Sequence, residues 1–125
     1  MPKVSRESAE HVESHGPVED RHEDLEGYTV NFLTMTQTID ATPLFDGLPD
    51  GRCSCPHWGY VFKGRMWFRS NAGEESYGPG DAFYVLPGHT SGAAADSEFL
   101  IFSPSEQIAE VEAHMARRAQ ELQSA

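Results

Sequence analysis

Short runs of strand-forming residues, separated by closely spaced glycine-containing turns, constrain the fold of this chain more than any other feature. The runs are rich in aromatic and β-branched residues and span 58–63, 65–70, 75–77, 81–86, 91–95 and 98–103. The intervening turns contain Gly64, Asn71-Ala72-Gly73, Gly78-Pro79-Gly80, Pro87-Gly88 and Asp96-Ser97. Many short strands with turns of this kind are typical of an antiparallel sandwich or barrel.

A longer strand-like run precedes these segments. Residues 28–39 alternate threonine with aromatic and aliphatic residues and lack helix-capping signals, so they predict the first strand. Residues 40–50 contain Pro43, Gly47 and Pro49, which indicates a loop.

The first 26 residues differ from the rest in composition. They hold three basic residues against eight acidic ones, so they contribute 3 − 8 = −5 to the net charge of −11. Large apolar residues are nearly absent, and a segment of this kind cannot bury enough surface to order itself. We therefore expect an extended acidic N-terminal arm over 1–26, partly held against the barrel or a partner subunit. Its histidines, His11, His15 and His22, could form a second metal site, although solvated side chains are the commoner outcome.

The end of the chain carries a helix-start signal. Ser103 is placed as an N-cap, Pro104 as the first helical residue and Glu106 as the third, which is a capping box with proline added. Apolar residues then fall on one face of a helix that reaches about residue 122: Ile108, Val111, Met115 and Leu122. This apolar stripe could pack on the barrel or on another subunit, and we favour the outer wall of the barrel. With 125 residues the chain is one domain, divided into the arm 1–26, a barrel 27–103 and a helical end 104–125.

The strongest candidates for metal ligands lie together in the middle of the chain. Cys53, Cys55 and His57 are spaced by two residues, so on a strand their side chains would share one face. In a straight strand the first and last would be about 13 Å apart, too far for one ion. Pro56 allows a bend between Cys55 and His57. The sequence therefore predicts a metal site in the fold between two strands.

This stretch resembles the first conserved motif of the cupins, which runs Gly, five residues, His-x-His, a short loop, Glu, six residues, Gly. Gly47, five residues, Cys53-x-Cys55, His57, six residues and Gly64 follow this order, with cysteines for both histidines and a histidine for the glutamate. The second motif, Gly, five residues, Pro-x-Gly-x-x-His, is approximated by the run from Gly80 to His89. The resemblance covers residues 47 to about 103 and implies an all-β fold, a small antiparallel cupin (jelly-roll) barrel.

The resemblance also implies a set of metal ligands. It places Cys53, Cys55 and His57 at or beside the metal positions of the first motif, and His89 near the strand that carries the remaining ligand. Each residue alone would fit a purely structural role, as a small buried thiol or a hydrogen-bonded imidazole. The occurrence of all four at these positions favours a metal site. Two thiolates and two imidazoles suit Zn²⁺ best, with Fe, Ni or Cu as less favoured alternatives.

The role of the metal stays open at the level of sequence. Four protein ligands would close a zinc shell, whereas catalysis needs an open position. Cupins include enzymes of several kinds and non-catalytic binders, so the resemblance implies no single activity. One hypothesis is a metal-containing protein that binds a small organic ligand in the barrel, and the absent glutamate favours it. The other is a metal-dependent cupin enzyme (a dioxygenase, an isomerase or a polyketide- or small-molecule-modifying enzyme), with Tyr60, Tyr84 or Glu98 as acid or base.

Charge and hydropathy limit the partners. A net charge of −11 argues against binding nucleic acid or an anionic membrane. No apolar run approaches 18 residues, and residues 1–5 lack the apolar core of a signal peptide, so we expect a cytoplasmic protein. The many aromatic residues exceed what one small core should cover. We therefore expect a homodimer in which strand 28–39 or the arm crosses to the partner, the competing expectation being a monomer covered by the helix.

Overall fold

The computed structural model describes residues 2–124, which form ten strands and one long helix. In chain order the strands are β1 (His11–His15), β2 (Val18–Leu25), β3 (Tyr28–Met35), β4 (Ile39–Asp40), β5 (His57–Lys63), β6 (Met66–Ser70), β7 (Gly73–Tyr77), β8 (Ala82–Val85), β9 (Thr90–Ala93) and β10 (Ser97–Pro104). Two short 3-10 helices, η1 (Thr42–Phe45) and η2 (Pro49–Gly51), lie between β4 and β5, and the helix α1 (Ser105–Ser124) ends the described chain.

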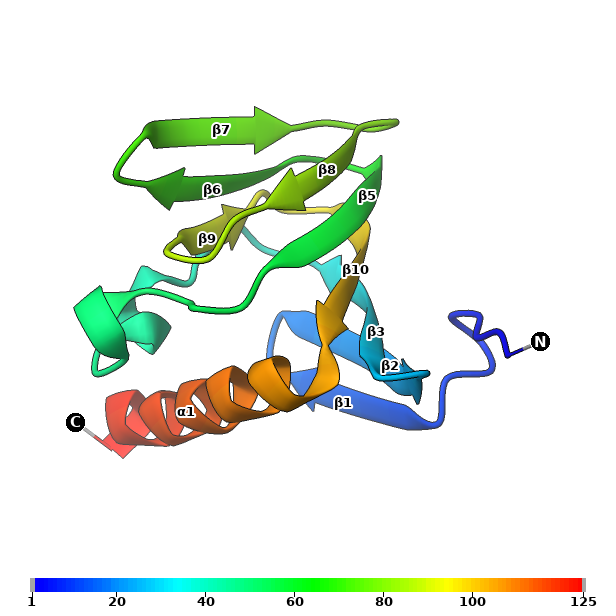
Figure 1. Ribbon diagram of the computed structural model, residues 1–125, viewed down its shortest axis with the longest axis horizontal. Coiled ribbons are helices and arrows are strands. Elements are labelled where there is room, and N and C mark those ends of the chain that lie inside the picture. The colour runs from blue at the N-terminus through cyan, green and yellow to red at the C-terminus, as the bar shows by residue number, and fades with distance from the viewer. Residues whose placement is uncertain (1, 125) are drawn as a thin grey trace.

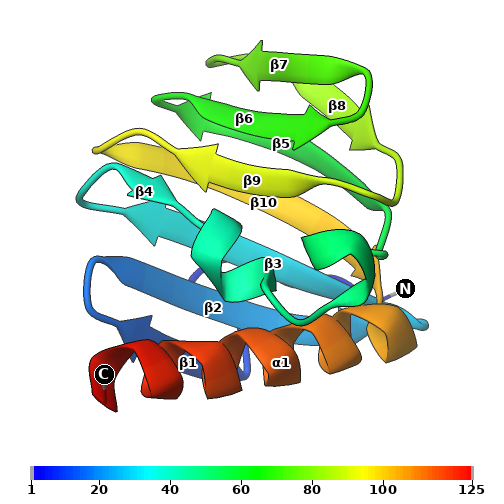
Figure 2. The ribbon, with the colours of Figure 1, turned by 90° about the vertical axis from the view of Figure 1, so that its left-hand side faces the viewer.

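The strands build two antiparallel sheets that pack face to face (Figure 1). The larger sheet has the order β1-β2-β3-β10-β5-β8 and the smaller one the order β4-β9-β6-β7. Helix α1 runs along the end of the sandwich where β1 and β2 lie (Figure 2). Among the described residues, no helix combines the length and the apolar character needed to cross a membrane.

The main core lies between the sheets and follows from the alternation of side chains along the strands. Val61, Phe83 and Phe99 of the larger sheet point inward and meet Met66, Phe68 and Ala93 of the smaller one. Burying each large apolar side chain stabilises the fold by roughly 1.5–3 kcal/mol. The predicted antiparallel barrel is confirmed, and the six predicted strands between residues 58 and 103 are found within a few residues of their expected bounds.

The predicted strand 28–39 is divided between the two sheets. β3 ends at Met35, and after a short bend β4 pairs with β9 in the smaller sheet. The three residues of the bend, Thr36, Gln37 and Thr38, are polar, which fits a break between two strands.

The extended arm predicted for residues 1–26 is wrong for residues 11–25. β1 and β2 form a hairpin, and β2 pairs with β3 in a continuous register from Val18↔Met35 to Leu25↔Tyr28. Backbone pairing orders this polar segment, and a side-chain contact supports it: buried Asp20 accepts hydrogen bonds from Asn31 Nδ2 at 2.9 and 3.2 Å. Pairing of this kind satisfies polar groups without requiring an apolar sequence.

The remaining N-terminal residues also contact their own chain. Arg6 donates a hydrogen bond to Thr34 at 3.1 Å and forms ion pairs with Glu98 at 3.5 Å and Glu19 at 3.9 Å. The segment therefore lies against the larger sheet of the same molecule.

Helix α1 packs through the predicted apolar stripe, except at its C-terminal end. Val111 is buried and, with the half-buried Ile108 and Met115, contacts a second cluster formed by Phe45, Cys53 and Cys55. Leu122 is exposed. The predicted cap is wrong at Ser103, because β10 continues to Pro104 and the Ser103 hydroxyl contacts His57 instead.

Glu112 of α1 lies in an acidic environment. Burial raises the pKa of this carboxyl to about 7, and the charges of Asp20, Glu13 and Asp24 add to the rise while His22 opposes it. A carboxyl whose pKa is raised on folding favours the folded state at low pH, and this contribution is lost as the pH rises from its unfolded value of 4.5 to about 7.

We expect Glu112→Gln to stabilise the protein by about 2 kcal/mol at pH 8 and to have little effect at pH 5, since glutamine mimics the protonated acid. Urea unfolding at the two pH values measures this. Glu110→Gln, at an exposed position of the same helix, is the matched control. An equal effect of Glu112→Gln at both pH values would contradict the assignment.

Candidate metal centre

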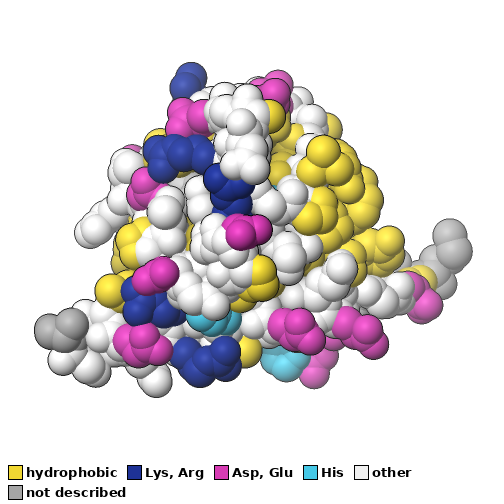
Figure 3. All heavy atoms as spheres, turned by 60° about the vertical axis from the view of Figure 1, so that its left-hand side comes forward, with side chains coloured by type: hydrophobic (Ala, Val, Ile, Leu, Met, Phe, Trp, Pro, Cys, Tyr) yellow, Lys and Arg dark blue, Asp and Glu magenta, His cyan; other side chains and the backbone are white. Residues whose placement is uncertain are grey.

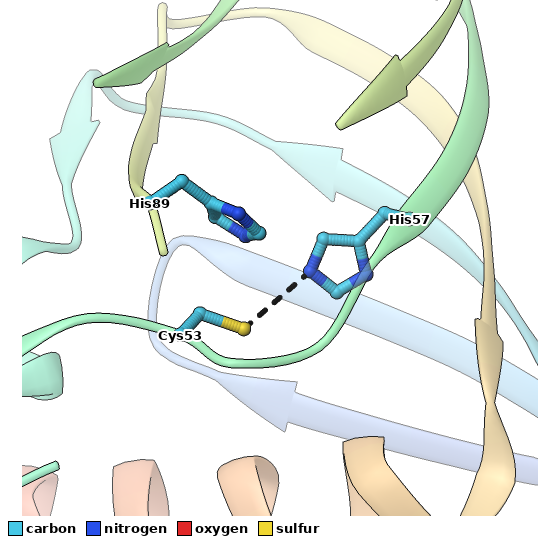
Figure 4. Close-up of side chains that lie close together, drawn as sticks. All are labelled: Cys53, His57 and His89. Carbon is cyan, nitrogen blue, oxygen red and sulfur yellow. Dashed lines mark hydrogen bonds between the residues drawn. The ribbon is translucent and has the colours of Figure 1, made fainter. Parts of the chain in front are cut away.

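Three buried side chains from separate segments meet near one end of the sandwich (Figure 4). Cys53 follows η2, His57 is the first residue of β5, and His89 precedes β9. A backbone bridge fixes Cys53 beside His89. The Cys53 N–H donates to the His89 carbonyl at 2.8 Å, and the Gly88 N–H donates to the Cys53 carbonyl at 2.7 Å. His57 is held by its pairing with Val85 of β8.

The distances suit a shared ion. One ligand atom from each residue lies within 4.8 Å of the other two, and Cys53 Sγ is 3.6 Å from His57 Nε2. The two imidazole rings are 4.9 Å apart at their centroids. Zinc bonds of about 2.0–2.3 Å place ligand atoms roughly 3.3–3.8 Å apart. Closing the group around an ion therefore requires movements of about 1 Å.

Hydrogen bonds orient both imidazoles. His89 Nδ1 donates to the Leu86 carbonyl at 2.7 Å, which leaves its Nε2 free to accept. His57 Nδ1 lies 2.7 Å from the Ser103 hydroxyl oxygen. In the tautomer that donates to Ser103, His57 Nε2 presents its lone pair towards Cys53. Such partners fix the tautomer and direction of metal-binding histidines.

Burial keeps this group uncharged in the absence of an ion. It lowers the pKa of His57 to about 3, with a further contribution from His89, and it also lowers the pKa of His89. Burial raises the pKa of the Cys53 thiol to about 11. At neutral pH both imidazoles are therefore free to bind a metal, whereas Cys53 must release a proton when it binds.

The structure brings together three of the four predicted ligands and leaves out Cys55. The Cys55 side chain is fully buried in the cluster beneath α1, with Phe45 and Val111. Its sulfur lies 3.4 Å from the Pro56 carbonyl oxygen. Residues 53–56 are not a regular strand, so a spacing of two residues does not put both thiols on one face.

A cavity of about 680 Å³ adjoins two of the three residues, Cys53 and His89, whereas His57 does not line it. Cys53, His89 and Phe68 form part of its wall, and residues of β7 and β8 line it as well. Polar side chains are available along the wall: Asp50, Arg52, Ser54, Ser70, Asn71, Glu75, Tyr77 and Tyr84. The group is thus placed beside a space large enough for a small organic molecule.

No protein-family model and no curated protein matches the sequence, but solved structures match the fold. The polyketide cyclase RemF from Streptomyces resistomycificus superposes with a TM-score of 0.57 at 15% identity, over 83% of this chain and 79% of that chain. An RmlC-like cupin from Shewanella frigidimarina gives 0.54 at 14% identity, over 81% of this chain and 88% of that chain. The protein has the cupin fold.

A larger protein contains the same fold as one part. A variant of oxalate decarboxylase (B. subtilis) superposes with a TM-score of 0.55 at 15% identity, over 81% of this chain but only 28% of that chain. At these identities the similarity shows a shared cupin architecture alone. It does not assign an activity.

Of the three acid or base candidates named from the sequence, only Tyr84 lines the cavity. Tyr60 is exposed, and Glu98 forms an ion pair with Arg6. The histidines of the N-terminal segment form no second group of three close ligand atoms within residues 2–124. His11 and His15 are exposed, whereas His22 is largely buried near Asp20.

Sequence reasoning missed the role of Ser103, because its position before Pro104 and Glu106 indicates a helix cap. Arg52 and Asn71 were also missed, although a hydrogen bond of 2.7 Å joins them at the cavity wall. They are far apart in sequence, and no local motif links them.

We expect Ser103→Ala to lower the affinity of the protein for Zn²⁺ by about 10-fold, since His57 loses the partner that orients its ring. Competition with a chelator measures the affinity. Ser105→Ala removes a neighbouring hydroxyl that bonds to Thr29 instead, so it should leave the affinity unchanged. Equal effects of the two substitutions would refute the orienting role.

Proposed function

We propose that this protein binds a divalent transition metal through Cys53, His57 and His89 and holds a small organic molecule in the adjoining cavity. The observation that carries the proposal is the convergence of three buried donor atoms within 4.8 Å of one another, two of which belong to residues that line that cavity, Cys53 and His89. Buried histidine and cysteine side chains usually form hydrogen bonds to other groups. Nitrogen and sulfur donors that converge with no carboxylate among them instead suit a transition metal.

Zn²⁺ is the metal that the donor set favours. One thiolate and two imidazoles match its preference for sulfur and nitrogen ligands, and they disfavour Mg²⁺ and Ca²⁺. Fe, Ni and Cu accept the same donors and remain alternatives. With three protein ligands, a tetrahedral ion keeps one position for water or for an oxygen of the bound molecule, which it would polarise as a Lewis acid.

The lining of the cavity supports a ligand with both apolar and polar parts. Phe68, Val85 and Leu86 offer apolar contacts, while Arg52 and Asn71 offer hydrogen-bond donors. A volume of about 680 Å³ lies within the usual range for small-molecule sites.

A metal-dependent enzyme is the second candidate, and the open position on the metal favours it. The four-ligand shell predicted from the sequence would have been closed, but Cys55 lies in the cluster beneath α1. Two proteins of the same fold are named as enzymes, a polyketide cyclase and an oxalate decarboxylase. Their fold is shared at 15% identity, so neither reaction is assigned to this chain.

The test is a metal analysis of protein purified without added metal, followed by measurement of water exchange. We expect about one equivalent of a transition metal per chain. Loading with Co²⁺ should then enhance the relaxation of solvent protons, because one coordinated water exchanges. A chain that neither retains nor takes up a metal would refute the proposal. A bound metal without an exchangeable water would indicate a closed, structural site.

A further inference from the structure

One side of the larger sheet carries a continuous aromatic surface. We call it the aromatic face and define it by the exposed side chains of Tyr28, Trp58, Tyr60, Phe62, Tyr84, Leu86 and Phe102. Hydrophobic side chains are also seen gathered on one flank in Figure 3. Only two other large apolar side chains are exposed among residues 2–124, Val12 and Leu122. Exposed apolar residues are normally scattered, so this concentration needs an explanation.

Strand register makes the face continuous. Trp58 of β5 pairs with Phe102 of β10 on one side and with Tyr84 of β8 on the other. The Trp58 ring lies 4.8 Å from that of Tyr84 and 6.0 Å from that of Tyr28. The Tyr60 and Phe62 rings are 5.3 Å apart. The intervening residues, Val61 and Phe83, point into the core. The alternation therefore gives these strands two apolar sides, as in a sheet covered on both faces.

We propose that a second copy of this chain covers the aromatic face, with the two copies related by a two-fold axis. The seven side chains that define the face are uncharged, in a chain with a net charge of −11. A partner recognised through charge would find no complement there. An uncharged aromatic surface is complementary to itself, which a two-fold interface requires. It is also the part of an acidic molecule where two copies meet with the least repulsion.

The exposed area matches what such a dimer needs. Six of the seven side chains are aromatic, each with roughly 200 Å² of surface, and the exposed fractions of the seven run from 37% to 68%. Each copy therefore offers about 600 Å², and the pair about 1,200 Å², which is the lower end of the range for stable interfaces.

The N-terminal segment contacts its own chain. Arg6 is held by Glu98, Glu19 and Thr34 of its own chain. This placement within one chain leaves the aromatic face uncovered.

Sedimentation of the full chain at about 20 µM should give twice the monomer mass of 13.8 kDa. Phe62→Asp should convert it to the monomer, because a carboxylate within an apolar interface loses its hydration. Phe62 is 49% exposed and does not line the cavity, so metal binding should be retained. That retention shows that the variant is folded.

Val12→Asp is the matched control, since Val12 is 56% exposed on β1, away from the aromatic face, and it should remain dimeric. A wild-type chain that stays at 13.8 kDa up to about 200 µM would overturn the proposal. So would a Phe62→Asp variant that stays dimeric, since its dimer would use another surface. Acrylamide quenching of the tryptophan fluorescence, to which the exposed Trp58 contributes, should be stronger in the Phe62→Asp monomer than in the wild type.

Discussion

Replacing Cys53 by alanine is expected to weaken Zn²⁺ binding by ~100-fold or more, and replacing Cys55 by alanine is expected to change it by less than about threefold. The two cysteines are both buried and lie two residues apart. Both pack in the cluster with Phe45 and Val111, but only Cys53 also belongs to the group of three close donor atoms. Removing the Cys53 thiolate leaves two imidazoles, which hold a divalent ion weakly.

Co²⁺ spectroscopy separates the two roles directly. A thiolate bound to Co²⁺ gives a charge-transfer band in the near ultraviolet, so the band should vanish in Cys53→Ala and persist at full intensity in Cys55→Ala. Chelator competition then gives the affinity, and His57→Ala should behave like Cys53→Ala. Loss of about half the band intensity in Cys55→Ala would show that both thiolates bind the ion and would support the four-ligand site predicted from the sequence.

Gly64→Ala is expected to destabilise the fold by about 2–5 kcal/mol, a large part of the stability of a small domain. Two costs add at this turn between β5 and β6. The residue has φ of +81°, where a side chain costs roughly 1–2 kcal/mol. A Cβ would also lie 2.6 Å from Ser97 Cα and would collide with the Ser97 hydroxyl. Relieving such overpacking costs about 1–3 kcal/mol.

The collision matters because Ser97 cannot move freely. It is fully buried, and its hydroxyl accepts a hydrogen bond from the Arg65 N–H at 3.0 Å and donates to the Arg65 carbonyl at 3.1 Å. Gly80→Ala is the matched control, since Gly80 has φ of +91° with open space where the Cβ would lie. Urea unfolding should show the larger loss for Gly64→Ala. Equal losses would mean that backbone conformation alone sets the cost.

The strands from 58 onward could be predicted because their pattern is local. Val61 and Phe83 alternate with exposed neighbours, and Gly64 and Gly80 mark turns with positive φ. Each of these signals depends on a few adjacent residues, so no knowledge of distant contacts was needed to place an antiparallel barrel.

The N-terminal hairpin could not be predicted because its order comes from a partner strand. β2 is held by the backbone of β3, and Asp20 is satisfied by Asn31. Composition describes what a segment could bury by itself, and it does not describe backbone hydrogen bonds to a strand that already exists.

Sequence alone determined which residues are candidates for the metal: three of the four predicted ligands, Cys53, His57 and His89, are those that meet. Tertiary structure decided the rest. The backbone bridge between Cys53 and His89 turns the Cys53 thiol towards the imidazoles. The Cys55 side chain is buried in the cluster on which α1 packs. Likewise, Ser103 contacts His57 because β10 extends past the predicted cap. A ligand set depends on side-chain directions at the irregular ends of strands, and those directions are set by packing between segments distant in sequence.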